Sequence, residues 1–143
     1  MSARSAPLAL SRRRDDAGGV RATILVCDDE DSLRALICAA LAGSGHEIVE
    51  ARNGGEALDR ARALRPDLLL LDMRLPGRSG LEVLAELRAD PGICDTPVIM
   101  LTAGTELAAR RDALAGGAAG FLGKPFSPLE LLEIVGQRLG GGS

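Results

Sequence analysis

The sequence contains almost no aromatic residues: its 143 residues include two Phe, no Tyr and no Trp. This scarcity disfavours single-stranded nucleic-acid binding by base stacking, and it disfavours aromatic cages for cationic ligands. Histidine and lysine occur once each, as His46 and Lys124. This chain therefore cannot by itself provide a metal site or a mechanism that needs two histidines.

Cysteine is also scarce, and its three positions (Cys27, Cys38 and Cys94) form no C-x-x-C pair, which argues against a disulfide framework or a zinc knuckle. No apolar run approaches the roughly 20 residues of a membrane span, and none near the N-terminus suits a signal peptide. The net charge of −3 gives no general attraction to nucleic acid or to anionic membranes. We therefore expect a cytoplasmic protein in a reducing compartment, with no direct contact to nucleic acid or membrane.

The length suits a single domain flanked by two tails. Residues 1–20 show no apolar periodicity, and we expect them to form a disordered N-terminal tail. Residues 140–143 (GGGS) suit a flexible tail or linker remnant. Apolar residues make up 46% of the chain, so residues 21–139 can form one folded domain with a full core.

Short apolar runs alternate with helical patterns five times. The run LLLL lacks the alternation of a half-exposed strand, which favours a parallel sheet buried on both faces. Five such units predict an α/β fold: a doubly wound, flavodoxin-like (βα)5 sheet with strand order 2-1-3-4-5. The predicted strands are residues 23–27, 47–51, 67–71, 97–101 and 119–123.

The helices between these strands carry start signals. Asn53, Ser79 and Ser127 are each followed three residues later by Glu, which predicts helix N-caps. The first helix is expected to bury an apolar stripe. The residues of this stripe are Leu33, Leu36, Ile37, Ala40 and Leu41.

Polar residues end or follow four of the predicted strands. They are the acidic run 28–31, Asp72, Thr102 and Lys124. Each alone has an ordinary explanation as a helix cap, a turn residue or a solvated charge. However, ligands bind at the carboxyl ends of strands in such sheets, and strands 1 and 3 are neighbours in this order. We therefore expect Asp28, Asp29 and Asp72 to converge on one pocket.

Three carboxylates in one pocket repel one another unless a cation joins them. One lysine leaves the group with a formal charge of −2, and its oxygen ligands favour a hard divalent ion such as Mg²⁺, for which Mn²⁺ can substitute. A carboxylate beside such an ion can attack phosphorus and form an aspartyl phosphate. Lys124 would add positive charge, and the Thr102 hydroxyl could donate to a phosphoryl oxygen.

Four motifs resemble the receiver domain of bacterial two-component response regulators, over about residues 21–139. They are ILVCDDE (24–30), LLLLDMRLPGRSG (68–80), VIMLTAG (98–104) and GFLGKPF (120–126). The resemblance implies that Asp72 is the phospho-acceptor. It also implies that Asp29 binds Mg²⁺ directly, that Asp28 binds it largely through water, and that the backbone carbonyl of Arg74 completes the protein ligands.

The same resemblance implies that Thr102 and Lys124 contact the phosphoryl group, that Phe121 is the aromatic switch residue, and that the Lys124–Pro125 bond is cis. The chain would then be a signalling domain that catalyses its own phosphorylation and dephosphorylation, rather than an enzyme with a separate substrate. The donor histidine would belong to a sensor histidine kinase or a histidine phosphotransfer protein. His46 is therefore not the donor, and we expect it on the solvent side.

The signal would leave through the face formed by the fourth helix, fifth strand and fifth helix, towards a downstream protein target. Leu131, Leu132 and Val135 are expected to make the fifth helix apolar enough for docking or for a phosphorylation-dependent homodimer. The chain would be either a stand-alone regulator or a receiver excised from a longer protein at Gly140.

Three other classes fit less well. A haloacid-dehalogenase-type phosphatase needs a second Asp where Arg74 stands, and a nucleotide or flavin binder needs a Gly-rich loop where residues 28–31 would repel phosphate. A phosphorylation-independent pseudo-receiver, acting as a protein-interaction module, is the main alternative. Such modules usually lose the acceptor, the acid pair, the Thr or the Lys, and this sequence keeps all of them.

Overall fold

A computed structural model describes residues 13–14, 20–103 and 107–139. Within them, five parallel strands form one sheet in the order β4-β3-β5-β6-β7, which is the predicted order 2-1-3-4-5. The predicted fold class is therefore confirmed. The strands are β3 (Thr23–Cys27), β4 (Glu47–Ala51), β5 (Leu68–Asp72), β6 (Val98–Thr102) and β7 (Gly120–Gly123).

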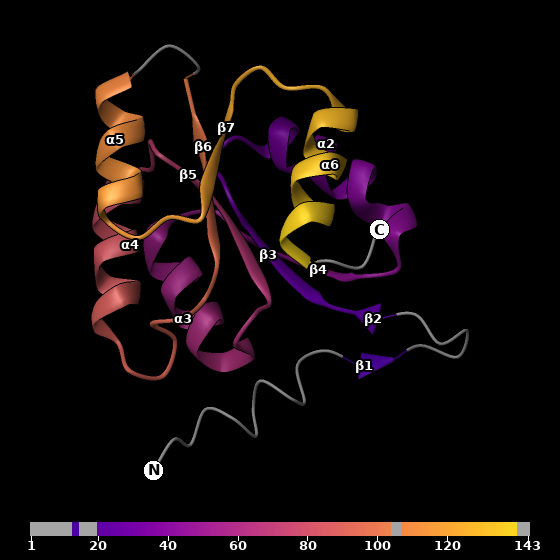
Figure 1. Cartoon of the computed structure of the whole chain (residues 1–143), viewed down its shortest axis with the longest axis horizontal. Coiled ribbons are helices and arrows are strands. Elements are labelled where there is room, and N and C mark those ends of the chain that lie inside the picture. The colour runs from indigo at the N-terminus through magenta and orange to yellow at the C-terminus, as the bar shows by residue number, and fades with distance from the viewer. Residues whose placement is uncertain (1–12, 15–19, 104–106, 140–143) are drawn as a thin grey trace.

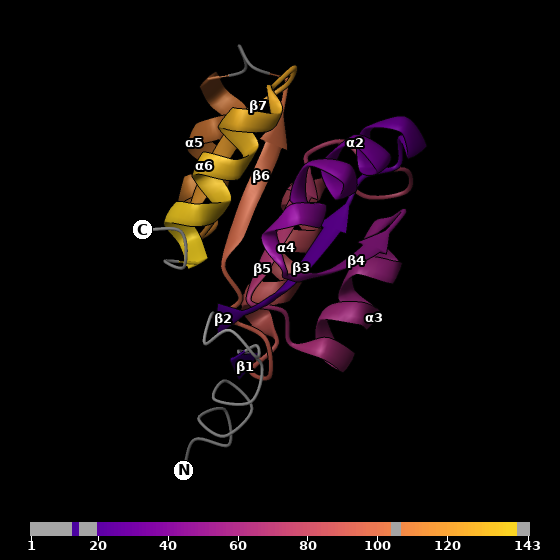
Figure 2. The same cartoon turned by 90° about the vertical axis from the view of Figure 1, so that its right-hand side faces the viewer.

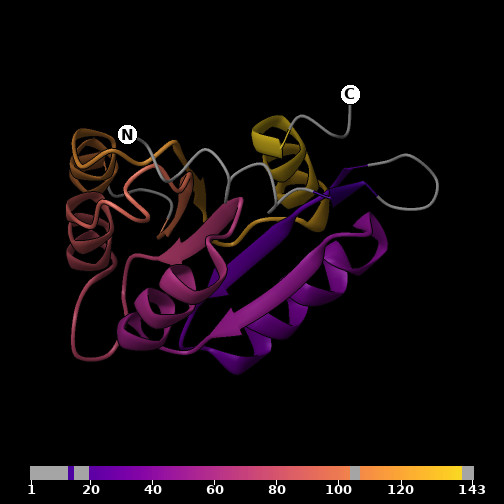
Figure 3. The same ribbon diagram turned by 90° about the horizontal axis from the view of Figure 1, so that it is seen from below.

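Helices cover both faces of this sheet. Figures 1 and 2 show α3, α4 and α5 on one face and α2 and α6 on the other, and Figure 3 shows the twist of the strands between the two layers. A short 3₁₀ turn, η1 (Ala42–Ser44), follows α2. The helices are α2 (Asp31–Leu41), α3 (Gly54–Leu64), α4 (Gly80–Ala89), α5 (Leu107–Ala115) and α6 (Pro128–Leu139).

The sheet separates two apolar cores, and β5 contributes to both. Leu69 and Leu71 pack with residues of α3, α4 and α5, whereas Leu68 and Leu70 pack with residues of α2 and α6. All four leucines are fully buried. Burying one leucine contributes about 1.5–3 kcal/mol, so this central strand anchors both layers.

The predicted helix N-caps are present in the structure. Asn53 accepts a hydrogen bond from the Glu56 N–H at 2.9 Å. Ser79 and Ser127 each accept from the backbone three residues on, and the glutamate there accepts in return from the cap residue's own N–H. These reciprocal bonds satisfy donors at the start of α4 and α6, which follow the loops after β5 and β7.

Two predicted apolar faces are partly wrong. On α2 the buried stripe is centred on Arg34, Ile37 and Leu41, so Leu36 lies outside it and is 43% exposed. On α6, Leu131 and Val135 belong to the core, because they are the residues that face the sheet. Leu132 is exposed, as the prediction requires, and Leu129, which the prediction did not include, is the other large apolar side chain that α6 exposes.

The N-terminal segment includes a short pair of strands. β1 (Arg13–Arg14) pairs antiparallel with β2 (Val20–Arg21), so the region expected to be disordered contains some regular pairing. Residues 1–12, 15–19 and 140–143 lie outside the described residues, and their disorder stays a prediction. None of the helices in the described part of the chain has the length and apolar character required to cross a membrane.

The first prediction concerns Gly80, the first residue of α4, which packs directly against the strand end that carries Asp72. A Cβ at this position would collide with the backbone oxygen of Asp72 and lie 2.9 Å from the Cα of Met73. We expect Gly80→Ala to lower the free energy of unfolding by about 1–3 kcal/mol, because backbone must move to admit the methyl group. Urea unfolding followed by circular dichroism measures this change.

Gly136 offers a matched control, because it lies inside α6 with open space around its Cα. Gly136→Ala should raise the free energy of unfolding by about 0.5–1 kcal/mol through helix propensity alone. Equal effects of the two substitutions would contradict the close packing of α4 against the end of β5.

Candidate functional site

The polar residues identified from the sequence lie at one edge of the sheet. Asp28 follows β3, Asp72 and Thr102 are the last residues of β5 and β6, and Lys124 follows β7. Strands β5 and β6 each begin and end one residue later than predicted, so Asp72 and Thr102 are themselves paired in the sheet. Because all five strands are parallel, their carboxyl ends meet at this edge.

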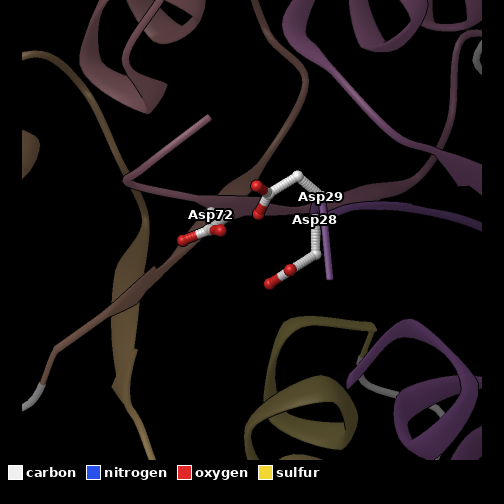
Figure 4. A group of neighbouring side chains, drawn as sticks. All are labelled: Asp28, Asp29 and Asp72. Atoms are coloured by element: carbon white, nitrogen blue, oxygen red, sulfur yellow. The ribbon is translucent and has the colours of Figure 1, made fainter. Parts of the chain in front are cut away.

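Three carboxylates converge there, as the sequence predicts. One oxygen from each of Asp28, Asp29 and Asp72 lies within 4.8 Å of the other two, and Figure 4 shows the three side chains gathered at the ends of their strands. Asp28 and Asp72 are buried, whereas Asp29 is exposed. The group therefore contains two carboxylates held within the protein and one, that of Asp29, in contact with solvent.

Lys124 joins two of these carboxylates. Its Nζ lies 3.0 Å from Oδ2 of Asp28 and 3.1 Å from Oδ1 of Asp72. The Lys124–Pro125 peptide bond is cis, as the resemblance implied. One ammonium against three carboxylates leaves the group with a formal charge of −2, so the oxygen donors fit a hard divalent cation such as Mg²⁺.

The surroundings make the charge of Asp72 unfavourable. Burial raises the pKa of Asp72, and the negative charge of Asp28 raises it further. A hydrogen bond from the Arg74 N–H, 3.2 Å from Oδ1, and the ammonium of Lys124 oppose the rise without cancelling it. An additional cation at this place would remove much of the penalty.

Lys124 stays charged in the same environment. Burial acts to lower the pKa of Lys124, but its hydrogen bonds with Asp28 and Asp72 act in the opposite direction and leave the pKa raised. The lysine therefore supplies a permanent positive charge beside Asp72 at neutral pH.

The hydroxyl of Thr102 is a buried polar group at the same edge of the sheet. The residue is 1% exposed, and among the described residues its Oγ1 has no hydrogen-bond partner. A buried hydroxyl without a hydrogen-bond partner lowers the stability of the fold, and such groups are unusual in folded proteins. Thr102 ends β6, which pairs with β5 beside Asp72, so its hydroxyl is a candidate donor to a group bound there.

Two other residues with predicted roles are Arg74, which follows β5, and Phe121, which lies on β7. The side chain of Arg74 is exposed, and the role of its carbonyl as a metal ligand stays a prediction. Phe121 is half-buried on β7, and the guanidinium of Arg110 from α5 lies 4.4 Å from the centre of its ring. The structure therefore gives Phe121 a cationic partner that the sequence did not indicate.

Cysteine and histidine do not enter this site chemically. All three cysteines lie in the described part of the chain, and none of them forms a disulfide there. Burial and the nearby charges of Asp72 and Asp28 raise the pKa of Cys27 to about 12, so its thiol stays protonated at neutral pH. His46, half-exposed and directly before β4, accepts a hydrogen bond from the Ala22 N–H at 2.9 Å through Nδ1, which is a structural contact.

Sequence reasoning missed Arg34. Its guanidinium is buried and donates to the backbone carbonyl of Asp28 at 2.7 Å. The available signal was a charged residue inside the apolar stripe of α2, one turn after the acidic run. Its contact with the acidic loop depends on tertiary packing and could not be deduced from that signal.

Comparisons with known proteins agree on one family. The family model for the response regulator receiver domain matches residues 24–136. MtrA of Mycolicibacterium smegmatis, a DNA-binding response regulator, is 42% identical over 120 residues, which are 84% of this chain and 51% of MtrA. PhoB of Pseudomonas aeruginosa, a phosphate regulon transcriptional regulatory protein, is 43% identical over 123 residues, which are 84% of this chain and 54% of PhoB.

Solved structures of similar proteins show the same fold. The chemotaxis protein CheY4 of Vibrio cholerae aligns with a TM-score of 0.77 at 33% identity, covering 82% of this chain and 98% of CheY4. A putative response regulator from Chloroflexus aurantiacus aligns with a TM-score of 0.80 at 34% identity, covering 84% of this chain and 98% of that protein. The chain spans about half the length of the curated relatives it matches.

The second prediction follows from the raised pKa of Asp72. Protonation of such a group stabilises the folded state below its unfolded pKa, and this stabilisation is lost as the pH rises through the folded pKa. At pH 7 the ionised side chain therefore destabilises the metal-free protein. We expect Asp72→Asn to raise the thermal midpoint by a few degrees in EDTA.

Added Mg²⁺ should reduce or reverse this difference, because only the parent protein gains full stabilisation from binding. Scanning calorimetry with EDTA or Mg²⁺ measures both effects. A lower midpoint for Asp72→Asn in EDTA would show that the ion pair with Lys124 outweighs burial and repulsion.

Proposed function

The chain belongs to the response regulator receiver family, and we propose that it accepts a phosphoryl group on Asp72 from a partner phosphohistidine in a two-component phosphorelay. The observation that carries this proposal is the combination, at one strand edge, of an acidic group, a bridging lysine and the Thr102 hydroxyl, which has no hydrogen-bond partner among the described residues. A phosphoryl group on Asp72 would bring the acceptor oxygens that this hydroxyl lacks.

In the transfer, a carboxylate oxygen of Asp72 forms a bond to phosphorus while the bond between phosphorus and the donor histidine nitrogen breaks. Lys124, 3.1 Å from Asp72, stabilises negative charge on the phosphoryl oxygens. Thr102 donates its hydroxyl hydrogen to one of them. When water attacks the phosphorus of this acyl phosphate, the bond between phosphorus and the Asp72 oxygen breaks, inorganic phosphate leaves and the carboxylate is restored, so the domain governs its own phosphorylated state.

Asp28, Asp29 and Asp72, with the carbonyl of Arg74, are the residues that would hold the metal. When bound, Mg²⁺ supplies the positive charge that offsets both the carboxylates and the phosphoryl oxygens. The protein's own part is to hold the buried Asp28 and Asp72 through partly buried hydrogen bonds, while exposed Asp29 leaves access for solvent and donor. Mn²⁺, which also accepts oxygen ligands, can replace Mg²⁺ here.

The partners that fit this chemistry are a sensor histidine kinase or a histidine phosphotransfer protein as donor, and a downstream protein as target. MtrA is named a DNA-binding response regulator, and this chain spans about half of it. The net charge of −3 gives the receiver itself no attraction to nucleic acid. We propose that its output passes through protein contacts.

The route of the signal runs along the face of the sheet that α5 covers. Met100 and Thr102 point to the same face of β6, and Met100 is the register partner of Phe121 on β7. Movement of Thr102 towards a phosphoryl group would change the space available to the Phe121 ring, which Arg110 covers.

The face of α5, β7 and α6 then changes shape. Both helices carry exposed large apolar side chains, which suits docking of a target or a phosphorylation-dependent homodimer. The exposed leucines are Leu107 and Leu114 on α5 and Leu129 and Leu132 on α6.

The third prediction tests phosphorylation itself. Incubation with acetyl phosphate and Mg²⁺ should add one phosphoryl group, seen by intact-mass spectrometry, and Asp72→Asn should abolish the addition. Asp29→Asn should slow it at least about tenfold, because a metal ligand is lost.

Asp59→Asn is a matched control. This carboxylate lies on α3 and forms an ion pair with Arg62. Its substitution should leave the rate unchanged. Absence of phosphorylation in the parent protein would instead support the alternative function, a pseudo-receiver that acts only as a protein-interaction module.

The fourth prediction concerns the response of the Phe121 ring to a group bound at Thr102, which NMR can follow because the chain has only two phenylalanines. Beryllofluoride with Mg²⁺ should shift the ring signals of Phe121 and the amides of α5, because the mimic engages Thr102. The amides of Glu47 and Ile48, at the start of the edge strand β4 on the opposite side of the sheet from β7, serve as the internal control and should change little.

Thr102→Ala should bind beryllofluoride yet lose the Phe121 response, since coupling requires a differential contact with the ligand. Shifts confined to the loops around Asp28, Asp72 and Lys124 in the parent protein would contradict this route.

A further inference from the structure

Arg34 is a buried cation outside the acidic group that nevertheless touches its backbone. Its side chain is 9% exposed. Nη1 donates to the carbonyl of Asp28 at 2.7 Å, Nε donates to Glu50 at 3.0 Å, and Nη2 donates to Asp31 at 2.5 Å. One guanidinium thus connects the loop after β3, the edge strand β4 and the first turn of α2.

These three bonds differ in their environment. The side chain of Glu50 is 51% exposed and that of Asp31 is 83% exposed, so water can replace Arg34 as the partner of either carboxylate at little cost. The bond to the Asp28 carbonyl is buried, and its loss would leave a polar group without a replacement. Of the three acceptors, the Asp28 carbonyl is therefore the one whose hydrogen bonding depends most on Arg34.

The carbonyl that Arg34 holds belongs to the peptide that joins Asp28 to Asp29. Because a peptide unit is planar, fixing its oxygen also fixes the N–H and the Cα of Asp29. The other groups of Asp28 are held as well: its N–H donates to the Ala51 carbonyl, and its carboxylate accepts from the Glu30 N–H and from Lys124. The exposed side chain of Asp29 gains its direction from this peptide.

We propose that Arg34 is a positioning residue for the metal site: it orients the Asp28–Asp29 peptide so that the Asp29 carboxylate faces Asp72. The inference rests on the proposed function in that it presumes divalent-cation binding by the three carboxylates. It adds a residue from α2 that touches neither the metal nor the phosphoryl group but sets the affinity for the metal.

Two simpler roles make different predictions. If Arg34 acted only through its charge, removing that charge would make the site more negative and Mg²⁺ would bind more tightly. If it acted only as a structural residue, its loss would lower the thermal midpoint and leave Mg²⁺ affinity unchanged well below that midpoint. A positioning role predicts weaker binding.

The experiment is a Mg²⁺ titration of the full chain followed by amide chemical shifts, with the thermal midpoint measured in parallel. Arg34→Gln should weaken Mg²⁺ binding about tenfold or more, as is typical when an outer partner of a metal ligand is lost. Arg34→Lys keeps the charge but loses the planar fork that serves three acceptors, so it should also bind Mg²⁺ more weakly than the parent. In EDTA, the Asp29 amide should exchange with solvent faster in both variants.

Arg62→Gln is the matched charge control, because Arg62 lies in the last turn of α3 and bonds Asp90 at 2.9 Å, at the opposite end of the sheet. It should change Mg²⁺ affinity less than twofold. Unchanged or tighter binding in folded Arg34→Gln would overturn the inference while the parent still binds Mg²⁺. If Arg34→Gln fails to fold, unchanged affinity in Arg34→Lys overturns it instead. A parent protein that neither binds Mg²⁺ nor takes up phosphate would overturn the proposed function, and the inference with it.

Discussion

Two buried carboxylates share one ammonium group at the carboxyl edge of the sheet, and much of the site depends on this arrangement. Lys124 lies about 3 Å from both Asp28 and Asp72, and Asp29 adds a third negative charge within reach. The raised pKa of Asp72 shows that one lysine does not offset burial and the charge of Asp28. An imbalance of this kind gives a site its affinity for a divalent cation and, with that cation, for a phosphoryl group.

Such a concentration of charge is unfavourable for folding, so the surrounding structure must hold it in place. The fully buried strand β5, with leucines in both cores, fixes the position of Asp72. Backbone hydrogen bonds and Arg34 fix Asp28. The Thr102 hydroxyl, which has no hydrogen-bond partner within the part of the chain that the structure describes, is a further local cost at the same edge. Unfavourable groups gathered in one place are typical of a site whose partner is a ligand.

The family and the fold narrow the function without defining its partners. MtrA and PhoB are about twice the length that this chain matches, whereas CheY4 is covered almost entirely. Membership of the receiver family is common to all of them. In this chain, a single lysine bridges two of the carboxylates, the guanidinium of Arg110 lies over the Phe121 ring, and α5 and α6 expose leucines.

The sequence by itself determined the α/β class, the strand order and the convergence of Asp28, Asp29 and Asp72. Buried parallel strands leave a local signal, and the order of the strands brings their ends together. Tertiary structure alone decided that Arg34 is buried while Leu36 is exposed, because the rotation of α2 against the sheet depends on contacts with β4 and the acidic loop. It also placed Leu131 and Val135 in the core and left Thr102 Oγ1 with no hydrogen-bond partner in residues 20–103 and 107–139. Burial and hydrogen bonding between residues distant in sequence are properties of packing, and no local pattern of residues encodes them.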